Sequence, residues 1–441
     1  MTLSDNTPTL SEGHVLTSIE ICAGAGGQAI GLHAAGFKHL ALVEIDEHAA
    51  TTLTDNIKSL DGWSWERKHC AVINDDVNEF RPLPSKEHPE AGLGNPSKSP
   101  GAPLLRRDLD LLAGGVPCPP FSHAGKQLGK DDERDLFPRM LALVDELRPR
   151  AVMIENVRGI RDAKFEEYRT YIEARLQGGR AKQPETGLEE DFKGLDYKVC
   201  GWEVLEASDF GVPQLRPRAV LVAIRKDVLG DLEFAWPTAA GAPKSVFEAL
   251  EDSMEARYQP YLEMGGDIAA DARKCLDDWK DTASKAAADK RDGGIAPTLV
   301  GGSKKHGGAD LGPSRAKAAW KQLGVSGMGV ANGYKESEKK GTRERDLFRP
   351  DGPMLTVEQA AIIQGFPQDW KFSGGKTAQY RQVGNAFPPP VAEAVGKAIA
   401  AVLRAAHERD KQREAETQDL LPGQIVPSLA DRTDDRERAG V

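Results

Sequence analysis

Short apolar runs alternate with amphipathic segments over the first half of the chain. The runs have the length of strands, several end in a glycine loop or an acidic residue, and the segments between them show helical periodicity. The predicted strands are residues 16–22, 40–43, 68–73, 109–113, 151–154, 199–205 and 219–225. This alternation predicts an α/β fold with a doubly wound sheet, whose ligands lie beyond the carboxyl ends of the strands.

The alternation fades after residue 225, and we predict that most of residues 226–351 form a second domain. Residues 291–350 hold twelve Lys or Arg against six Asp or Glu, in a chain whose formal net charge is −10. This segment is the candidate basic face for nucleic acid, and a solvated loop region is the alternative. Three polar segments are expected to be surface loops or disorder: residues 81–107, residues 178–196 and the tail from about 404.

The composition narrows the class of protein. A chain of 441 residues with 39% hydrophobic content can bury a large core and favours two domains. No secretion signal is evident at the start, and no run approaches the ~18 apolar residues of a membrane span, so we expect a cytoplasmic protein. The five cysteines include no C-x-x-C pair, which argues against a disulfide framework and against a cysteine-rich metal site.

A glycine loop follows the first predicted strand. Gly24, Gly26 and Gly27 allow close approach of a ligand, and Glu44, about twenty residues on, can accept hydrogen bonds from ribose hydroxyls. The loop also fits G-x-G-x-x-A, so by itself it does not separate a nicotinamide cofactor from S-adenosylmethionine, and a structural tight turn is a further alternative. Asp76 ends the third strand, where it can bind an adenine amino group or cap the next helix.

A cysteine lies on a proline-rich loop between a predicted strand and a predicted helix. In residues 114–122, two glycines precede Cys118 and three prolines surround it, so the loop should be stiff and able to present a thiol. A small apolar side chain packed in a turn is the alternative. Glu155 ends the next strand at the same edge of the sheet, where it can meet the thiol at one substrate, cap a helix or form a salt bridge.

Two arginines precede the last predicted strand. Residues 214–218 read Gln-Leu-Arg-Pro-Arg, and the guanidinium groups of Arg216 and Arg218 suit carboxylates, phosphates or a base edge. The alternative is that the two arginines form salt bridges at the start of the strand.

In this order, the motifs resemble those of the bacterial DNA (cytosine-5) methyltransferases, a family that uses S-adenosylmethionine. The resemblance runs from about residue 17 to 399 and includes two later stretches, Gln-Gly-Phe-Pro at 364–367 and Tyr-Arg-Gln-Val-Gly-Asn-Ala at 380–386. Each motif alone is weakly specific, whereas the ordered set is highly specific. The resemblance implies a Rossmann-like methyltransferase domain at 14–225, a smaller target-recognition domain at 226–370 and a return to the catalytic domain at 371–403. The tail at 404–441 falls outside the resemblance, and its charged composition predicts disorder.

The resemblance also assigns roles to residues. The residues implied to bind S-adenosyl-L-methionine are Cys22, Ala23, Gly24, Gly26, Gly27, Glu44, Asp76 and Asn385. The implied catalytic residues are Cys118, Glu155, Arg216 and Arg218. The expected DNA contacts are Ser122, Gln214, Lys304, Lys305, Arg315 and Lys317. One departure from the family pattern is Cys22, which stands where the family usually has an aromatic ring that packs against the cofactor.

The implied chemistry begins with attack of the Cys118 thiolate on carbon 6 of cytosine, which activates carbon 5. Glu155, carrying or sharing a proton, would hydrogen-bond the base edge. Arg218 would hold the substrate, and Arg216 would support the loop or a phosphate. The base must be flipped out of the duplex to reach this site.

The expected partner is double-stranded DNA, bound by a monomer, in a restriction-modification or phage-defence setting with a cognate endonuclease. Three other readings of the sequence compete with this one. They are the same chemistry on RNA, a catalytically inactive DNA-binding homologue, and a nicotinamide dehydrogenase. The last leaves the cysteine loop and the arginine motif unexplained, and a long variable segment before residue 364 favours DNA over RNA.

Overall fold

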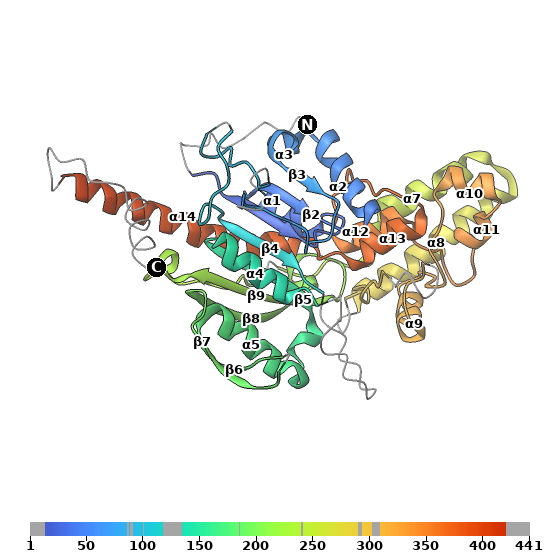
Figure 1. Ribbon diagram of the computed structural model, residues 1–441. Helices are drawn as coiled ribbons and strands as arrows, with labels where there is room; N and C mark the ends of the chain where they lie inside the picture. Colours follow the sequence, from blue (N-terminus) through green and yellow to red (C-terminus); the bar gives the residue numbers. More distant parts are fainter. Residues whose placement is uncertain are drawn as a thin grey trace.

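A seven-stranded mixed sheet organises the first half of the protein (Figure 1). The computed structural model describes residues 14–85, 88, 91–99, 101–117, 135–184, 186–239, 241–289, 293–301 and 309–419. The strands, in spatial order, are β3 (Ala71–Ile73), β2 (Lys38–Val43), β1 (Thr17–Ile21), β4 (Leu111–Gly115), β5 (Ala151–Val157), β9 (Pro217–Arg225) and β8 (Tyr197–Glu206). The first five are parallel, and β9 runs antiparallel to both of its neighbours. The predicted doubly wound α/β sheet is confirmed, with an antiparallel strand near one edge.

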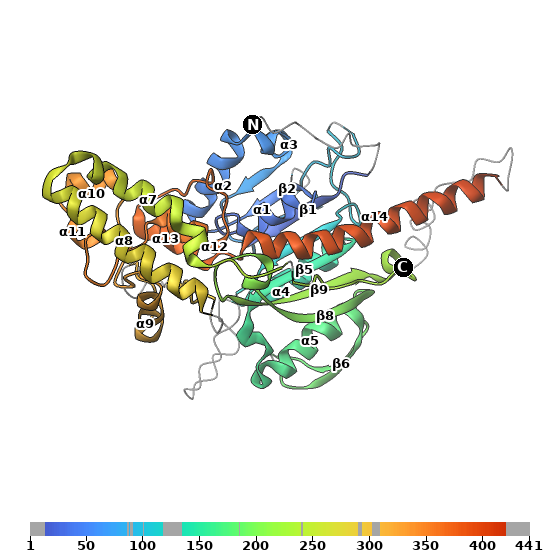
Figure 2. The same cartoon turned by 180° about the vertical axis from the view of Figure 1, so that it is seen from behind.

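Helices cover both faces of the sheet (Figures 1 and 2). On one face, α4 (Phe137–Leu147) and α5 (Glu166–Gln177) share a core with the strands. On the other, α1 (Gly27–Ala34) and the long α14 (Pro389–Asp419) form a second core. Further helices beside β2 and β3 are α2 (Glu47–Ser59) and α3 (Ser64–His69). The sheet is therefore buried on both faces, as its nearly continuous apolar strands require.

Two glycines allow the C-terminal helix to return to the N-terminal one. A Cβ atom added at Gly27 would overlap the carbonyl oxygen of Phe387, and one at Gly31 would overlap that of Pro389. The backbones of α1 and α14 can approach this closely only where a side chain is missing. The start of α14 thus contacts α1 directly after the glycine loop.

A helical unit lies at one end of the sheet (Figures 1 and 2). Its longest helices, α7 (Val246–Met264) and α8 (Gly266–Ala288), pack against each other, and a capping box of Ser245 and Glu248 begins α7. Trp279, Trp320 and Tyr258 are buried in its core. Its other helices are α9 (Ser314–Gln322), α10 (Tyr334–Lys340), α11 (Arg343–Asp346), α12 (Val357–Gln364) and α13 (Lys376–Asn385).

The predicted tail differs from the structure. Residues 404–419 of the predicted 404–441 tail continue α14 as a helix instead of being disordered, and residues 420–441 lie outside the described residues. Leu403 and Ala406 are buried, and Arg409 donates to the carbonyl oxygens of residues 227–229. These contacts supply a packed face that the charged composition does not reveal.

Other boundaries also shift. Residues 178–196 contain a hairpin of β6 (Gly179–Lys182) and β7 (Glu189–Phe192), where loop or disorder was predicted. The third strand is shorter than predicted because residues 64–69 form α3. After β9, the short helix α6 (Lys226–Leu229) and residues 232–236 pack on the sheet core. The helical unit therefore begins near residue 245.

The stretch Lys376–Thr417 is long and apolar enough, by length and composition alone, to cross a membrane. However, 67% of its most apolar window is buried inside the protein. Core helices often meet the same criterion, and the contacts of α14 with α1 identify it as one of them.

Candidate functional site

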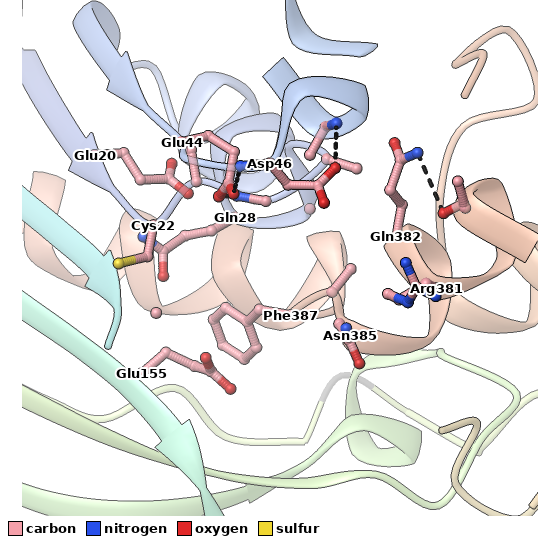
Figure 3. Close-up of a pocket in the computed structure, with 18 residues that line it drawn as sticks. Glu20, Cys22, Gln28, Glu44, Asp46, Glu155, Arg381, Gln382, Asn385 and Phe387 are labelled. Carbon is pink, nitrogen blue, oxygen red and sulfur yellow. Dashed lines mark hydrogen bonds between the residues drawn. The ribbon is translucent and has the colours of Figure 1, made fainter. Parts of the chain in front are cut away.

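A cavity of about 260 Å³ opens at the carboxyl ends of the parallel strands (Figure 3). The loops after β1 and β2, the ends of β4 and β5, and the α13–α14 junction form its wall. Its lining residues are Glu20, Cys22, Ala23, Gly24, Ala25, Gly27, Gln28, Glu44, Asp46, Ala49, Gly115, Glu155, Ala378, Arg381, Gln382, Asn385, Ala386 and Phe387. The structure thus brings together seven of the predicted site residues from four distant parts of the sequence: Cys22, Ala23, Gly24, Gly27, Glu44, Glu155 and Asn385.

Glu44 ties the glycine loop to the end of β2. One of its carboxylate oxygens accepts a hydrogen bond from the backbone N–H of Gly24 at 2.7 Å, and the other accepts from that of Asp46 at 2.8 Å. Burial raises the pKa of Glu44, while the two amide donors oppose that shift. Gly24 has a φ of 55°, and Cys22 adopts a similar left-handed φ of 53°, which is uncommon outside glycine.

The helical unit clamps this loop through Trp370. The indole Nε1 donates to the carbonyl oxygen of Ala25 at 2.9 Å, and the ring lies against Gly26, where a Cβ atom would come 2.8 Å from it. Gly26 does not line the cavity. This position needs a glycine for two reasons. As the N-cap of α1 it has a φ of 92°, and a side chain here would collide with the indole.

Asp76 also lies outside the cavity lining. Its carboxylate accepts from the backbone N–H of Asn78 at 2.9 Å and from the Asn78 side chain at 3.0 Å. These contacts belong to a turn at residues 77–79, and the next described element after β3 is strand β4, so Asp76 caps no helix within the described residues.

An acid and an arginine from antiparallel strands meet at the cavity wall. Glu155 on β5 lies opposite Val220 on β9, and Arg218, two residues away, shares the same face of the sheet. The Arg218 Nε lies 2.9 Å from a Glu155 carboxylate oxygen, and both side chains are nearly buried. Burial raises the pKa of Glu155, and the two nearby arginines, Arg218 first, offset part of this rise. The Glu155 carboxyl group is thus suited to holding a proton beside a ligand.

Arg216 points away from the cavity into the protein. It is 1% exposed, and its guanidinium donates to the carbonyl oxygens of Leu299 at 2.6 Å, Gly384 at 2.7 Å and Ala386 at 2.9 Å. Burial lowers its pKa well below the usual value. Of the two predicted alternatives, support of the loop or contact with a phosphate, these contacts fit the first, and they make Arg216 a positioning residue that joins three segments of the chain instead of a catalytic one.

Gln214, predicted to contact DNA, is fully buried in the same network. Its side chain accepts from the backbone N–H of Leu299 at 2.8 Å and donates to the side-chain oxygen of Gln364 at 2.8 Å. Since its donor and acceptor atoms are both used internally, it holds the strand start against the helical unit.

The base of the predicted nucleophile loop is anchored by Asn156. Its side-chain amide donates to the carbonyl oxygen of Val116 at 2.7 Å, and Gly115 lines the cavity. Cys118 and Ser122 lie outside the described residues. Consecutive Cα atoms are 3.8 Å apart, so covalent geometry keeps the Cα of Cys118 within about 11 Å of that of Gly115.

The four cysteines that the structure describes have thiols whose ionisation is disfavoured. Burial, with the charges of Glu44 and Glu20, raises the pKa of Cys22 to about 12. Burial also raises the pKa of Cys70, Cys200 and Cys275, to about 11 for Cys200. Each is therefore a poor source of thiolate near neutral pH.

The predicted basic face is partly neutralised within the chain. Lys317 forms an ion pair with Asp310 at 2.9 Å, and Lys321 forms one with Asp351 at 2.6 Å. Arg315, on α9, is exposed. Lys304 and Lys305 fall outside the described part of the chain.

Several residues of the cavity wall were not predicted. Glu20 is an acid inside a fully buried strand, and burial raises its pKa well above the usual value. The sequence signal that could have identified Glu20 is the presence of an acid within the apolar run of β1. Arg381 lies within the 380–386 stretch, but no role was assigned to it, and Gln28 and Phe387 carry no comparable signal, because only the fold brings α13 and the start of α14 to the glycine loop.

Known proteins that match most of the chain identify its family. The family model of the C-5 cytosine-specific DNA methylases matches residues 16–401. The type II methyltransferase M.NaeI of Lentzea aerocolonigenes is 46% identical over 88% of this chain and 75% of its own. M.NgoMIV of Neisseria gonorrhoeae, also a type II methyltransferase, is 40% identical over 88% of this chain and 98% of its own.

Among solved structures, a putative DNA modification methyltransferase encoded within an Escherichia coli prophage covers 88% of this chain at 21% identity, with a TM-score of 0.47. The assignment depends on the sequence matches, which span nearly the whole sheet and the helical unit. The chain belongs to the C-5 cytosine-specific DNA methylase family.

Proposed function

We propose that this DNA cytosine-5 methyltransferase moves a methyl group from S-adenosyl-L-methionine to a flipped cytosine through a covalent adduct with Cys118. The observation that carries the proposal is that Glu155, paired with Arg218 behind it, lines the same cavity as the Glu44-anchored glycine loop. A proton-holding acid beside a nucleotide-binding loop suits base activation next to a methyl donor.

The cavity residues fit such a cofactor. Gly24 and Gly27 leave the loop backbone open to close approach, and Glu44 supplies carboxylate oxygens at the end of β2. The buried amide of Gln28 lines the cavity with both polar atoms unpaired among the described residues. Asn385 lies at the α13 end of the same wall. When bound, the cofactor would supply an electrophilic sulfonium methyl group.

Cys118 is the proposed nucleophile for carbon 6 of cytosine. Support comes from the family motif, from its position in the sequence three residues after Gly115 of the cavity wall, and from the raised pKa of each described cysteine. Addition of the thiolate would place electron density on carbon 5, which would bond the methyl group as the bond between that methyl and the sulfonium sulfur breaks and leaves a neutral thioether. A base would then take the carbon-5 proton, and the electron pair left behind would re-form the ring double bond and expel the thiolate from carbon 6.

Glu155 would donate its proton toward ring nitrogen 3 as negative charge develops in the base. Arg218, fixed by its 2.9 Å contact with that carboxyl group, would orient it and hold the base edge. Removing the base from the duplex costs roughly a few kcal/mol, which contacts to phosphates must offset. We propose that the helical unit within residues 226–370 supplies such contacts, with Arg315 exposed for this role.

The biological setting is also a proposal. The named relatives are type II methyltransferases, which supports a role in restriction-modification alongside an endonuclease. We propose a cytoplasmic monomer. Methylation mapping at single-base resolution, on DNA from cells that express wild type or Glu155→Gln, tests the activity. The proposal expects 5-methylcytosine at one recurrent sequence with wild type only, and unmethylated DNA with wild type would overturn it.

A further inference from the structure

One basic side chain lines the cavity within the described part of the chain, and it comes from α13. The cavity wall also carries four acids, Glu20, Glu44, Asp46 and Glu155, against the single cation of Arg381. Three of these acids have partners: Glu44 and Glu155 as described, and Asp46, which caps α2. One carboxylate oxygen of Glu20 is buried without a partner among the described residues, and the only cation of the described wall, Arg381, also lacks one.

The guanidinium of Arg381 has no hydrogen bond or ion pair among the described residues, and its Nε is buried without an acceptor. Leaving a buried charged donor unsatisfied is costly, and such groups in native proteins usually have a partner. The backbone of Arg381 is held against Gly301, because a Cβ atom there would come 2.6 Å from the Arg381 carbonyl oxygen. The backbone of Arg381 is thus fixed beside the cavity, and its half-buried guanidinium lines that cavity without a protein partner among the described residues.

The position of Arg381 identifies the anion. In Figure 3 it lies beside Asn385 and Gln382, on the opposite side of the cavity from Cys22 and Glu155. The transferred methyl group must face Glu155, where the base is activated. The methionyl portion of the cofactor extends from the same sulfur atom and ends in a carboxylate, which is the cofactor's only anionic group.

We infer that Arg381 binds the α-carboxylate of S-adenosylmethionine and selects cofactors that carry it. This inference rests on the proposed function. A planar guanidinium can make two parallel hydrogen bonds to a carboxylate, which combines affinity with orientation. Arg381 would thereby orient the methionyl portion and help direct the methyl group toward the base.

The test measures binding to the full-length protein by calorimetry, using S-adenosylmethionine and its decarboxylated analogue. Wild type should prefer the carboxylate form by roughly 10- to 100-fold, the range for a hydrogen bond to a charged group. Arg381→Met should abolish this preference while binding the decarboxylated form within about 2-fold of wild type. Arg381→Lys, which keeps the charge, should retain part of the preference and serves if the methionine variant fails to fold.

Lys397→Met is the matched control, since Lys397 is an exposed cation on α14 paired with Glu393 and lies outside the cavity. It should leave both affinities unchanged. If Arg381→Met lowered the affinity for both ligands equally, or for neither, the inference would be wrong. A variant with normal cofactor binding but weaker DNA binding and a flatter salt dependence would assign Arg381 to a phosphate instead.

Wild type that binds both forms equally, yet methylates DNA, would refute this inference and leave the proposed function standing. Wild type that binds neither form and transfers no methyl group would refute the proposed function itself.

Discussion

Replacement of Arg216 by methionine should destabilise the fold far more than it alters the chemistry. The guanidinium satisfies the carbonyl oxygens of Leu299, Gly384 and Ala386, at 2.6, 2.7 and 2.9 Å. Each buried carbonyl left without a donor costs about 1–3 kcal/mol. Relief from burying a charge offsets part of this total, so we expect a net loss of about 3–5 kcal/mol in the free energy of unfolding.

Urea denaturation followed by circular dichroism measures that loss, and Arg218→Met is the matched control. Arg218 contacts Glu155 at the cavity wall instead of joining backbone segments. Its replacement should lower kcat, and because Glu155 can take up a proton when its partner is removed, it should cost less free energy of unfolding than Arg216→Met. If Arg216→Met keeps its stability within about 0.5 kcal/mol and still loses kcat, Arg216 acts on the substrate and the positioning role is wrong.

Three further substitutions test the site. Glu155→Gln should lower kcat by about 10²–10⁴-fold with a smaller effect on DNA affinity. Because the pKa of Glu155 is raised and its protonated form is the active one, the wild-type rate should fall as pH rises through that pKa, and a pH–rate profile of the variant should lack this decline. Cys22→Ala should keep kcat within about 3-fold, and peptide mapping should find Cys22 resistant to iodoacetamide at pH near 7, since its pKa is about 12. Gly27→Ala should weaken cofactor binding, measured by calorimetry, and lower stability by about 1–3 kcal/mol, because its methyl group would overlap the Phe387 carbonyl. Unchanged cofactor affinity would show that the α1–α14 contact is not needed for the cavity.

The sheet and the part of the cavity formed by the glycine loop, Glu44 and Glu155 could be predicted because their sequence signals are local. Strand length, the glycine loop and Glu44 follow one another in the sequence, and β1 and β2 bring them together. Glu155 could be named for the same reason, since the end of a parallel strand determines which edge of the sheet it reaches.

Residues whose role depends on distant segments were misjudged. Arg216 and Gln214 carry groups that suit DNA, but residues 299–301 and α13 surround them and use those groups internally. No role was assigned to Arg381 from the sequence, because its place in the cavity wall depends on the return of the chain to the glycine loop. The charged end of α14 was likewise expected to be disordered, since its packing partners lie at residues 227–229.

The most direct test of the mechanism is trapping on duplex DNA that carries 5-fluorocytosine at the target position. Fluorine at carbon 5 cannot leave as a proton does, so the enzyme should remain covalently attached after methyl transfer. Peptide mapping by mass spectrometry then locates the bond. The account predicts a methylated base joined to the Cys118 sulfur, and no adduct with Cys118→Ala. An adduct at Cys22, or methylation that persists in Cys118→Ala, would contradict it.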